Sequence, residues 1–504
     1  MKLLALLPLA FLLLGLGPAK GARPNLLLIT VDDMSCDSVG VFGCKLKGTT
    51  PHIDKLAHES LRFGHAHVQV GNCYPSRNVM FSGRYPHNTG VEGFYQVKPI
   101  KFPVLCDLMK AGGYYTAIRG KVSHSTPYQP YPWDADLTTG PDGSKLHLKD
   151  VPSYGECTQR GIAAARAADK PFCLNINISD PHKPFWKPND PHKVSRIFKP
   201  EEVPIPGFLF DHPDVRKELA LYYTSVRRAD DAVGAILQAL EESGQKDHTI
   251  VMFLSDHGMP LPFAKTQLYH HSTRTPWIIR WPGVTRADSV NDSHMISAVD
   301  LLPTVLDMAG LKNPGALDGQ SFVPVMKGQL LDDGRHAVFK VYNENAGGNR
   351  HPIRGVQTRK HLYLFNPWSD GENVFRTATN GTATYRQMKK LAATDQKIAS
   401  RLATMDHRSV EELYDVEKDP DCLHNLAGEE AHQDIKRTLQ ARLRKFMEAS
   451  RDHALAPFLK RDDPTALSAY MKKVQDESAQ RRATRRKGKN KNKARQKGPR
   501  KKAP

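Results

Sequence analysis

The chain has 504 residues, of which 39% are hydrophobic and 25% are charged, and its formal net charge is +19. This composition is ordinary for a soluble globular protein, and no segment beyond the first 22 residues is apolar enough to span a bilayer, which excludes a membrane-spanning protein. The length exceeds what one simple core supports, so we expect one large domain and one smaller domain.

The first 22 residues predict a secretory signal peptide. Met1-Lys2 is a short basic start, and residues 3–16 form an apolar run that is shorter than the roughly 20 residues a membrane span requires. Small residues favour cleavage after Ala19 over cleavage after Ala22. We therefore expect an exported protein in a periplasmic, extracellular or lysosome-like compartment, with no stable membrane insertion.

Seven cysteines fit an oxidising compartment without fixing a disulfide pattern. Apart from Cys73, their spacing does not reveal how they pair. No spacing is Cys-x-x-Cys, so we do not expect a zinc site built from thiolates. The six cysteines available for pairing are Cys36, Cys44, Cys106, Cys157, Cys173 and Cys422.

Apolar runs alternating with helical stretches predict an α/β fold. The predicted strands are residues 25–31, 116–119, 172–178, 249–254 and 277–281. Runs that are apolar at every position suit central strands covered on both faces. The predicted helices are residues 53–63, 103–111 and 215–243. Together they predict a large, mainly parallel sheet sandwiched by helices.

Polar groups follow four of the predicted strands directly. In sheets of this kind, ligands bind beyond the carboxyl ends of the strands. We therefore expect a functional site at that edge, within a catalytic domain that covers residues 23–335. The groups concerned are Asp32-Asp33, Gly120-Lys121, residues 179–182 and Asp256-His257.

The pattern changes after residue 335. Short, closely spaced strand candidates at 336–342, 353–359 and 360–365 are followed by a helix candidate at 429–452. They predict a smaller C-terminal α+β domain over residues 336–465, in which a helix packs on an antiparallel sheet.

Residues 466–504 predict a basic, disordered tail. Residues 481–504 contain 13 Lys and Arg and no acid, so they account for most of the net charge. They include no aliphatic or aromatic residue larger than alanine and cannot form a core. This segment is suited to contact polyanions, and export favours a sulfated polysaccharide or the cell envelope over nucleic acid.

Cys73 opens the run Cys73-Tyr74-Pro75-Ser76-Arg77, and Ser82-Gly83 follows nine residues later. The alternative to a functional role is a buried core cysteine, which is the usual place of this residue type.

Asp32, Asp33 and Asp256 predict a metal site, because carboxylate oxygens are the ligands that hard cations such as Ca²⁺ select. The alternative for an Asp-Asp pair is a helix cap or a turn. Two acidic positions that each follow an apolar strand favour the metal.

The Cys73 motif and these strand ends resemble type I sulfatases of the alkaline phosphatase superfamily, and the resemblance covers residues 24–430. Some features are similar to sulfamidases and others to iduronate-2-sulfatases. The resemblance implies an alkaline phosphatase-like fold. It also implies that a separate formylglycine-generating enzyme oxidises Cys73 to formylglycine, whose hydrated aldehyde attacks sulfate esters.

The same resemblance implies the site residues. Arg77 would hold the formylglycine, and Lys121 and Lys265 would bind sulfate. His124 would take a proton from the formylglycine diol, and His182 would face the leaving oxygen. The implied ligands of one Ca²⁺ are Asp32, Asp33, the modified Cys73, Asp256 and His257. Many family members have Asn where this chain has His257, which leaves the metal less defined.

The implied substrate is an N- or O-sulfated sugar or polysaccharide, and the sequence does not choose between them. Residues 128–133 and 270–274 are polar and aromatic, and they serve equally well as sugar contacts or as surface loops. Two other functions stay open. One is hydrolysis of phosphate or phosphonate esters on the same fold. The other is a non-catalytic, polyanion-binding protein in which Cys73 stays a thiol.

Overall fold

The computed structural model describes residues 23–94, 96–97, 100–329, 335–345 and 349–496, with the side chains of 485–496 left out. The predicted signal peptide lies outside these residues. Within the described ranges, no helix combines the length and the apolar character that a bilayer crossing requires.

The large sheet has eight strands in the order β5-β4-β6-β1-β7-β8-β2-β9. The strands β5, β4, β6, β1 and β7 run parallel to one another. β8 is antiparallel to both β7 and β2, while β2 and β9 are parallel. The predicted mainly parallel sheet is confirmed. The bounds are β1 Asn25–Asp32, β2 Leu61–Phe63, β4 Tyr115–Arg119, β5 Ala135–Asp136, β6 Phe172–Pro181, β7 Thr249–Ser255, β8 Trp277–Arg280 and β9 Ser289–Asn291.

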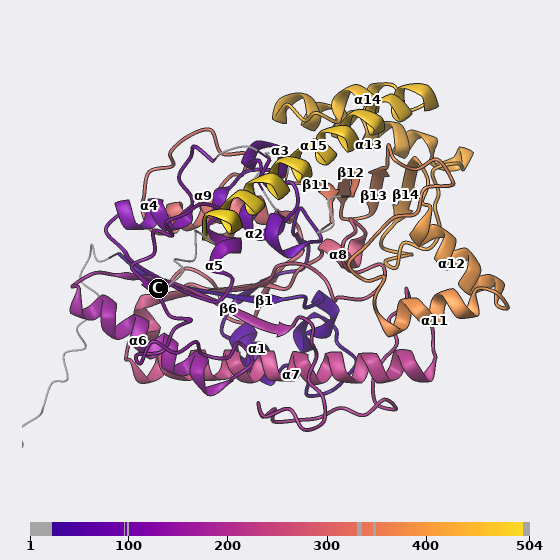
Figure 1. Ribbon diagram of the computed structural model, residues 1–504. Helices are drawn as coiled ribbons and strands as arrows, with labels where there is room; N and C mark the ends of the chain where they lie inside the picture. Colours follow the sequence, from indigo (N-terminus) through magenta and orange to yellow (C-terminus); the bar gives the residue numbers. More distant parts are fainter. Residues whose placement is uncertain (1–22, 95, 98–99, 330–334, 346–348, 497–504) are drawn as a thin grey trace, which may run out of the picture.

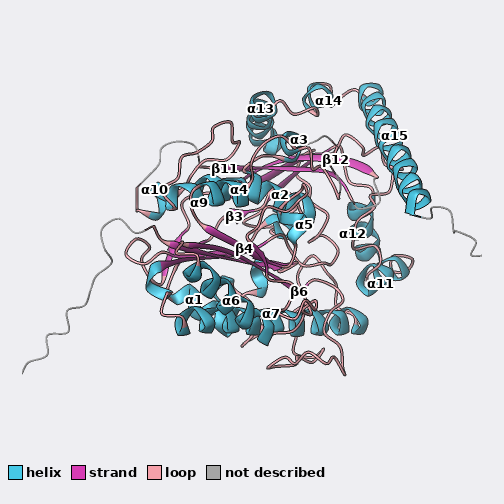
Figure 2. Cartoon of the chain, turned by 60° about the vertical axis from the view of Figure 1, so that its left-hand side comes forward, coloured by secondary structure: helices cyan, strands magenta, loops and turns pink. Residues whose placement is uncertain are grey.

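β1 is a central strand of the fold, and every one of its residues is buried. Leu27, Ile29 and Val31 belong to the core that contains α1, α6 and α7. Leu26 and Leu28 belong to the core that contains α2, α4 and α9. A strand alternates its side chains between two faces, so an all-apolar strand requires helices on both (Figures 1 and 2). The helices are α1 Pro51–His58, α2 Cys73–Ser82, α4 Leu105–Ala111, α6 Pro152–Ala167, α7 Pro213–Glu242 and α9 Leu301–Met308.

The helix predicted over 53–63 is wrong at its end. α1 stops at His58, and Leu61–Phe63 form β2, which pairs with β8 and β9. Long-range pairing at the sheet edge overrides the local helical pattern there.

The C-terminal sheet has four antiparallel strands in the order β11-β12-β13-β14, as predicted for the smaller domain. Val341 N–H of β11 donates to Gln69 O at 2.9 Å, and both sheets contribute to one core. The two sheets therefore form one body. The bounds are β11 Ala337–Glu344, β12 Arg350–Thr358, β13 His361–Phe365, β14 Glu411–Asp415, α11 Ala383–Leu391, α12 Gln396–Asp406, α13 Gln433–Ser450 and α14 Leu455–Leu459.

The structure differs from the expected disordered tail, because Pro464–Gln496 form one helix, α15, along the outer edge of the molecule (Figure 2). Leu467 and Val474 are each 5% exposed, and Gln475 Nε2–H donates to Arg350 O at 2.8 Å. The first half of α15 thus has apolar anchors that the composition of residues 481–504 lacks. Residues 497–504 lie outside the described ranges.

Two truncations should separate the halves of α15. Removing residues 464–504 should lower the free energy of unfolding by roughly 3 kcal/mol, because the burial of Leu467 and Val474 is lost. Removing residues 481–504 should leave it unchanged, since Ser478 is the last buried side chain among those described in α15. Urea unfolding monitored by circular dichroism measures both. Equal destabilisation by the two truncations would show that the basic half is packed as well.

Candidate active site

Three carboxylates meet where β1 and β7 end. Asp32 is the last residue of β1, Asp33 follows it, and Asp256 follows β7. The register pairs Val31 with Ser255, so the ends of these parallel strands coincide. Asp33 N–H donates to Asp256 Oδ1 at 3.0 Å, and all three carboxylates are fully buried. The predicted convergence of these side chains is found in the structure.

His257 completes a possible cation site. The ligand atoms of Asp32, Asp33, Asp256 and His257 all lie within 4.8 Å of one another, and those of Asp32, Cys73 and His257 do so as well. His257 Nε2 lies 3.1 Å from Asp33 Oδ1. His257 Nδ1 lies 3.0 Å from Gly258 O, and since a carbonyl only accepts, Nδ1 carries the proton. The lone pair of Nε2 therefore faces the carboxylates.

This donor set fits a divalent cation. Among the described residues, neither His257 Nε2 nor the oxygens of Asp32 take part in an aligned hydrogen bond, although all are buried. A lone pair beside a carboxylate in a buried site is unfavourable unless a cation or a proton lies between them. Fixing one ring nitrogen by a hydrogen bond to a carbonyl is also how proteins orient metal-binding histidines.

Three cationic side chains compensate the three carboxylates. Arg77 Nε–H donates to Asp256 Oδ2 at 3.0 Å, and Lys265 Nζ lies 2.7 and 2.6 Å from the oxygens of Asp33. Lys121 Nζ contacts Asp32 Oδ2. Burial works to raise the pKa of Asp32, but Lys121 and other nearby cations outweigh it and hold this pKa well below its ordinary value. The pKa of Asp33 is lowered as well, with Lys265 the main cation acting against burial, whereas burial raises the pKa of Asp256 above its ordinary value.

Cys73 is the first residue of α2, and Arg77 lies one turn further along. The spacing of four residues places both on the same side of the helix. Arg77 Nη1 donates to Thr30 Oγ1 at 2.6 Å and to Asn177 Oδ1 at 2.7 Å, while Ser76 Oγ donates to Asp256 O at 2.7 Å. These bonds fix the start of α2 over the carboxylates. Burial raises the pKa of the Cys73 thiol to about 12.

The turn after β4 delivers Lys121 and His124. Asn177 of β6 donates from Nδ2 to Arg119 O at 3.1 Å and to Gly120 O at 3.0 Å, so one amide ties this turn to Arg77. His124 follows in the short helix α5 Val122–Ser125. Burial, reinforced by Lys121, lowers the pKa of His124 to about 3, which keeps its ring neutral.

His182 lies just beyond β6, in a turn that acts electrostatically on Asp32 and Asp33. Its Nδ1 lies 2.5 Å from Lys183 O, so Nδ1 carries a proton and Nε2 is the atom free to act. The structure thus brings all the predicted site residues to one edge of the sheet. Sequence reasoning missed the groups that support them, Thr30, Asn177, Lys149 and Arg228. Each is an ordinary polar residue whose partner is far away in the chain.

The loops at 128–133 and 270–274 make internal contacts. Trp133 Nε1 donates to Thr126 Oγ1 at 2.8 Å, Tyr128 bonds Asp107, and the His270 ring lies 2.8 Å from Gln357 Nε2. His271 Nε2 lies 3.2 Å from Asp421. These contacts are structural, and they leave the sugar-binding role of both loops a prediction.

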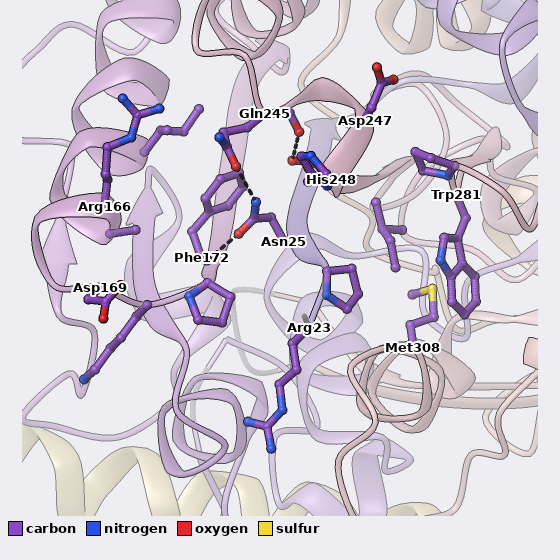
Figure 3. A pocket seen from close by; sticks show the side chains of 18 residues that line it. Arg23, Asn25, Arg166, Asp169, Phe172, Gln245, Asp247, His248, Trp281 and Met308 are labelled. Carbon is purple, nitrogen blue, oxygen red and sulfur yellow. Dashed lines mark hydrogen bonds between the residues drawn. The ribbon is translucent and has the colours of Figure 1, made fainter. Parts of the chain in front are cut away.

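A cleft lies at the end of the sheet where β1, β6 and β7 begin, away from the carboxylates, and Figure 3 shows its lining residues. It has a volume of about 880 Å³ and is lined where β1, β6 and β7 begin, by residues such as Asn25, Phe172 and Gln245. None of the predicted site residues lines it.

The comparisons with known proteins agree with this geometry. The profile of the sulfatase family matches residues 24–311, and that of the N-sulphoglucosamine sulphohydrolase C-terminal family matches residues 256–374. Human N-sulphoglucosamine sulphohydrolase is 27% identical over 490 residues, which cover 88% of this chain and 93% of the human protein.

Solved structures show the same fold. One, a complex with its substrate D-glucosamine-2-N,6-O-disulfate, matches with a TM-score of 0.62 at 18% identity, over 86% of this chain and 99% of the other. The phosphonate monoester hydrolase of Agrobacterium radiobacter matches with a TM-score of 0.60 at 19% identity, over 85% of this chain and 96% of the other.

A methyl group at Gly120 should destabilise the site. Gly120 has φ +69°, and a Cβ there would lie 2.9 Å from Asn177 O. We expect Gly120→Ala to lower the free energy of unfolding by roughly 2 kcal/mol, through both backbone strain and the clash. Gly143→Ala is the control, because its φ is +82° with nothing within 4 Å. Equal effects of the two substitutions in urea unfolding would show that the clash is relieved at no cost.

Proposed function

The chain belongs to the sulfatase family, a family of sulfuric ester hydrolases, and from this we propose that it removes sulfate from a sulfated sugar or polysaccharide. The nucleophile is a formylglycine made from Cys73, with one divalent cation beside it. One observation carries the proposal: Cys73, three carboxylates, His257 and three cations converge at one buried edge.

The substrate class follows from the relatives. The human relative is named as a hydrolase of N-sulphoglucosamine, and one protein of the same fold was solved with glucosamine 2-N,6-O-disulfate. We propose a sugar carrying an N- or O-sulfate, for which glucosamine 2-N,6-O-disulfate is a suitable probe.

The proposed cation is Ca²⁺, held by Asp32, Asp33, Asp256, His257 and the modified Cys73. When bound, it supplies positive charge that stabilises the sulfuryl oxygens in the transition state. Arg77, Lys121 and Lys265 already balance the charge of the three carboxylates. The positive charge of the divalent cation is therefore in excess, and it favours the binding of an anionic substrate.

The side chains divide the remaining work. The diol form of formylglycine supplies the attacking oxygen, and Arg77 holds it at the start of α2. Lys121 and Lys265, both at the site, bind the sulfuryl oxygens. The neutral ring of His124 accepts a proton from the diol. His182 Nε2 donates a proton to the leaving oxygen, since its Nδ1 is engaged by Lys183 O.

Export and maturation belong to the same proposal. The leader-like residues 1–22 support export to a periplasmic, extracellular or lysosome-like compartment, where sulfated polysaccharides are found. A formylglycine-generating enzyme or an equivalent maturase is the required partner, because conversion of a thiol to an aldehyde is an oxidation that requires a separate oxidant. All seven cysteines are described and are free thiols in the structure.

Hydrolysis of phosphate or phosphonate esters is the second candidate, because a phosphonate monoester hydrolase shares the fold. The fold alone does not choose between tetrahedral anions. Comparing kcat/KM for 4-nitrophenyl sulfate and 4-nitrophenyl phosphate distinguishes the two functions. A larger kcat/KM for the phosphate would favour the second candidate.

The nucleophile can be tested directly. In protein produced with the maturase, the mass of the peptide containing Cys73 should be lower by about 18 Da. Cys73→Ala should lower kcat by at least about 10³-fold, because it removes the nucleophile. Cys44→Ala is the matched control, since Cys44 is partly exposed and outside the site. Full activity with an unmodified Cys73 would overturn the proposal.

The basic half of α15 is proposed to contact polyanions. Residues 481–496 repeat Lys and Arg at helical spacings of four, a like-charge arrangement that bound anions relieve. Removing residues 481–504 should abolish retention on a heparin column at about 0.15 M salt and leave kcat for 4-nitrophenyl sulfate unchanged. Retention by the truncated protein would contradict the proposed contact. Retention lost from a protein that, even after maturation, never hydrolyses sulfate would favour the non-catalytic function.

A further inference from the structure

One buried lysine holds the turn that carries His182. The side chain of Lys149 is 9% exposed. Its Nζ donates to Asp180 Oδ1 at 2.6 Å, to His182 O at 2.8 Å and to Ser179 O at 3.3 Å. An ammonium group has three N–H donors, and all three are used here. Lys149 therefore has no donor left for a substrate.

The surrounding contacts make this arrangement rigid. Asp180 Oδ2 also accepts from Arg228 Nε at 2.7 Å, and Arg228 Nη1 donates to Asp190 at 2.9 Å. Tyr154 Oη donates to Leu148 O at 2.7 Å and accepts from Ser179 N–H at 3.2 Å. The segment of Lys149 and the end of β6 are thus tied together from two sides.

The turn is connected to the carboxylate cluster on one side and to the His182 ring on the other. Pro181 pairs with Asp32 in the register of β6 and β1. The His182 ring is fixed by Lys183 O, at 2.5 Å from Nδ1, so the ring moves with the backbone of residues 182–183. A shift of the His182 carbonyl consequently moves Nε2.

We propose that Lys149 is a positioning residue that holds His182 at the leaving oxygen of the substrate. The inference rests on the proposed function. In the step concerned, an oxygen of the formylglycine diol forms a bond to sulfur and the bond from sulfur to the leaving oxygen breaks. The electron pair of that bond goes to the leaving oxygen, which takes the proton from His182 Nε2. Lys149 touches neither substrate nor proton. It sets the distance over which the proton moves.

The proposal makes the effect of Lys149 depend on the leaving group. A sugar alkoxide is strongly basic and requires the proton, whereas 4-nitrophenolate leaves without one. With Lys149→Met we expect kcat for glucosamine 2-N,6-O-disulfate to fall by about 10²-fold with KM within about twofold, because a misplaced acid loses most of its effect. For 4-nitrophenyl sulfate the fall should be less than about threefold. Equal losses on both substrates would overturn the proposal.

The control is Lys145→Met, which makes the same chemical change at an exposed lysine of the same segment and should leave both rates unchanged. In a His182→Gln background, Lys149→Met should add less than about a twofold loss, because the two substitutions remove one function. Independent, multiplying losses would show that Lys149 acts elsewhere. If Lys149→Met does not accumulate as folded protein, Lys149→Gln replaces it with the same readouts.

A measurement without activity separates this inference from the proposed function. Amide hydrogen exchange in the peptide covering residues 177–185 should become faster in Lys149→Met and stay unchanged in Lys145→Met. Unchanged exchange in Lys149→Met would overturn the role of Lys149 even in an active enzyme. A different outcome is faster exchange in Lys149→Met while the unsubstituted protein hydrolyses neither glucosamine 2-N,6-O-disulfate nor 4-nitrophenyl sulfate. That outcome would keep the role of Lys149 in the turn and overturn the proposed function.

Discussion

The site depends on one constraint, the burial of three carboxylates where two adjacent parallel strands end. Asp32, Asp33 and Asp256 have no access to water, so their charge requires compensation from within the protein. The carboxylates lie together because the register of the sheet brings the ends of β1 and β7 to the same place. Much of the surrounding structure supplies the positive charge and the hydrogen bonds that these buried carboxylates require.

The compensating cations come from three separate parts of the chain. Arg77 arrives on α2, Lys121 on the turn after β4, and Lys265 on the loop after β7. Asn177 connects two of these parts, since it accepts from Arg77 and donates to the turn that carries Lys121. The turn that carries Lys121 also requires a glycine at residue 120, because φ there is +69° and a Cβ would lie 2.9 Å from Asn177 O.

The sequence predicted the strands that are buried on both faces, and with them the edge at which the polar residues gather. The strand ends indicated Asp32, Asp33 and Asp256, whereas the roles of Arg77, Lys121, His124, His182 and Lys265 came from the family resemblance and stay predictions. The sequence did not predict Lys149 or Arg228, since nothing local distinguishes a side chain whose partner, Asp180, lies 31 or 48 positions away in the chain. The helix α15 was not predicted because the prediction of a disordered tail rested on the basic composition of residues 481–504. The side chains that pack α15 against the protein, Leu467 and Val474, lie before that segment. β2 was missed because its pairing with β8 and β9 is set by the sheet and not by the segment itself.

The burial of Cys73 imposes an order of events on the life of the protein. Cys73 is 3% exposed and is the first residue of α2, a helix whose residues are almost all buried. A second enzyme cannot reach that atom once α2 has packed against the carboxylates. For the oxidation proposed above, this burial requires the modifying enzyme to act before this part of the chain folds, so the two processes compete in time. A cell that folds the chain faster than it oxidises Cys73 would accumulate well-folded protein that no later treatment with the oxidising enzyme activates.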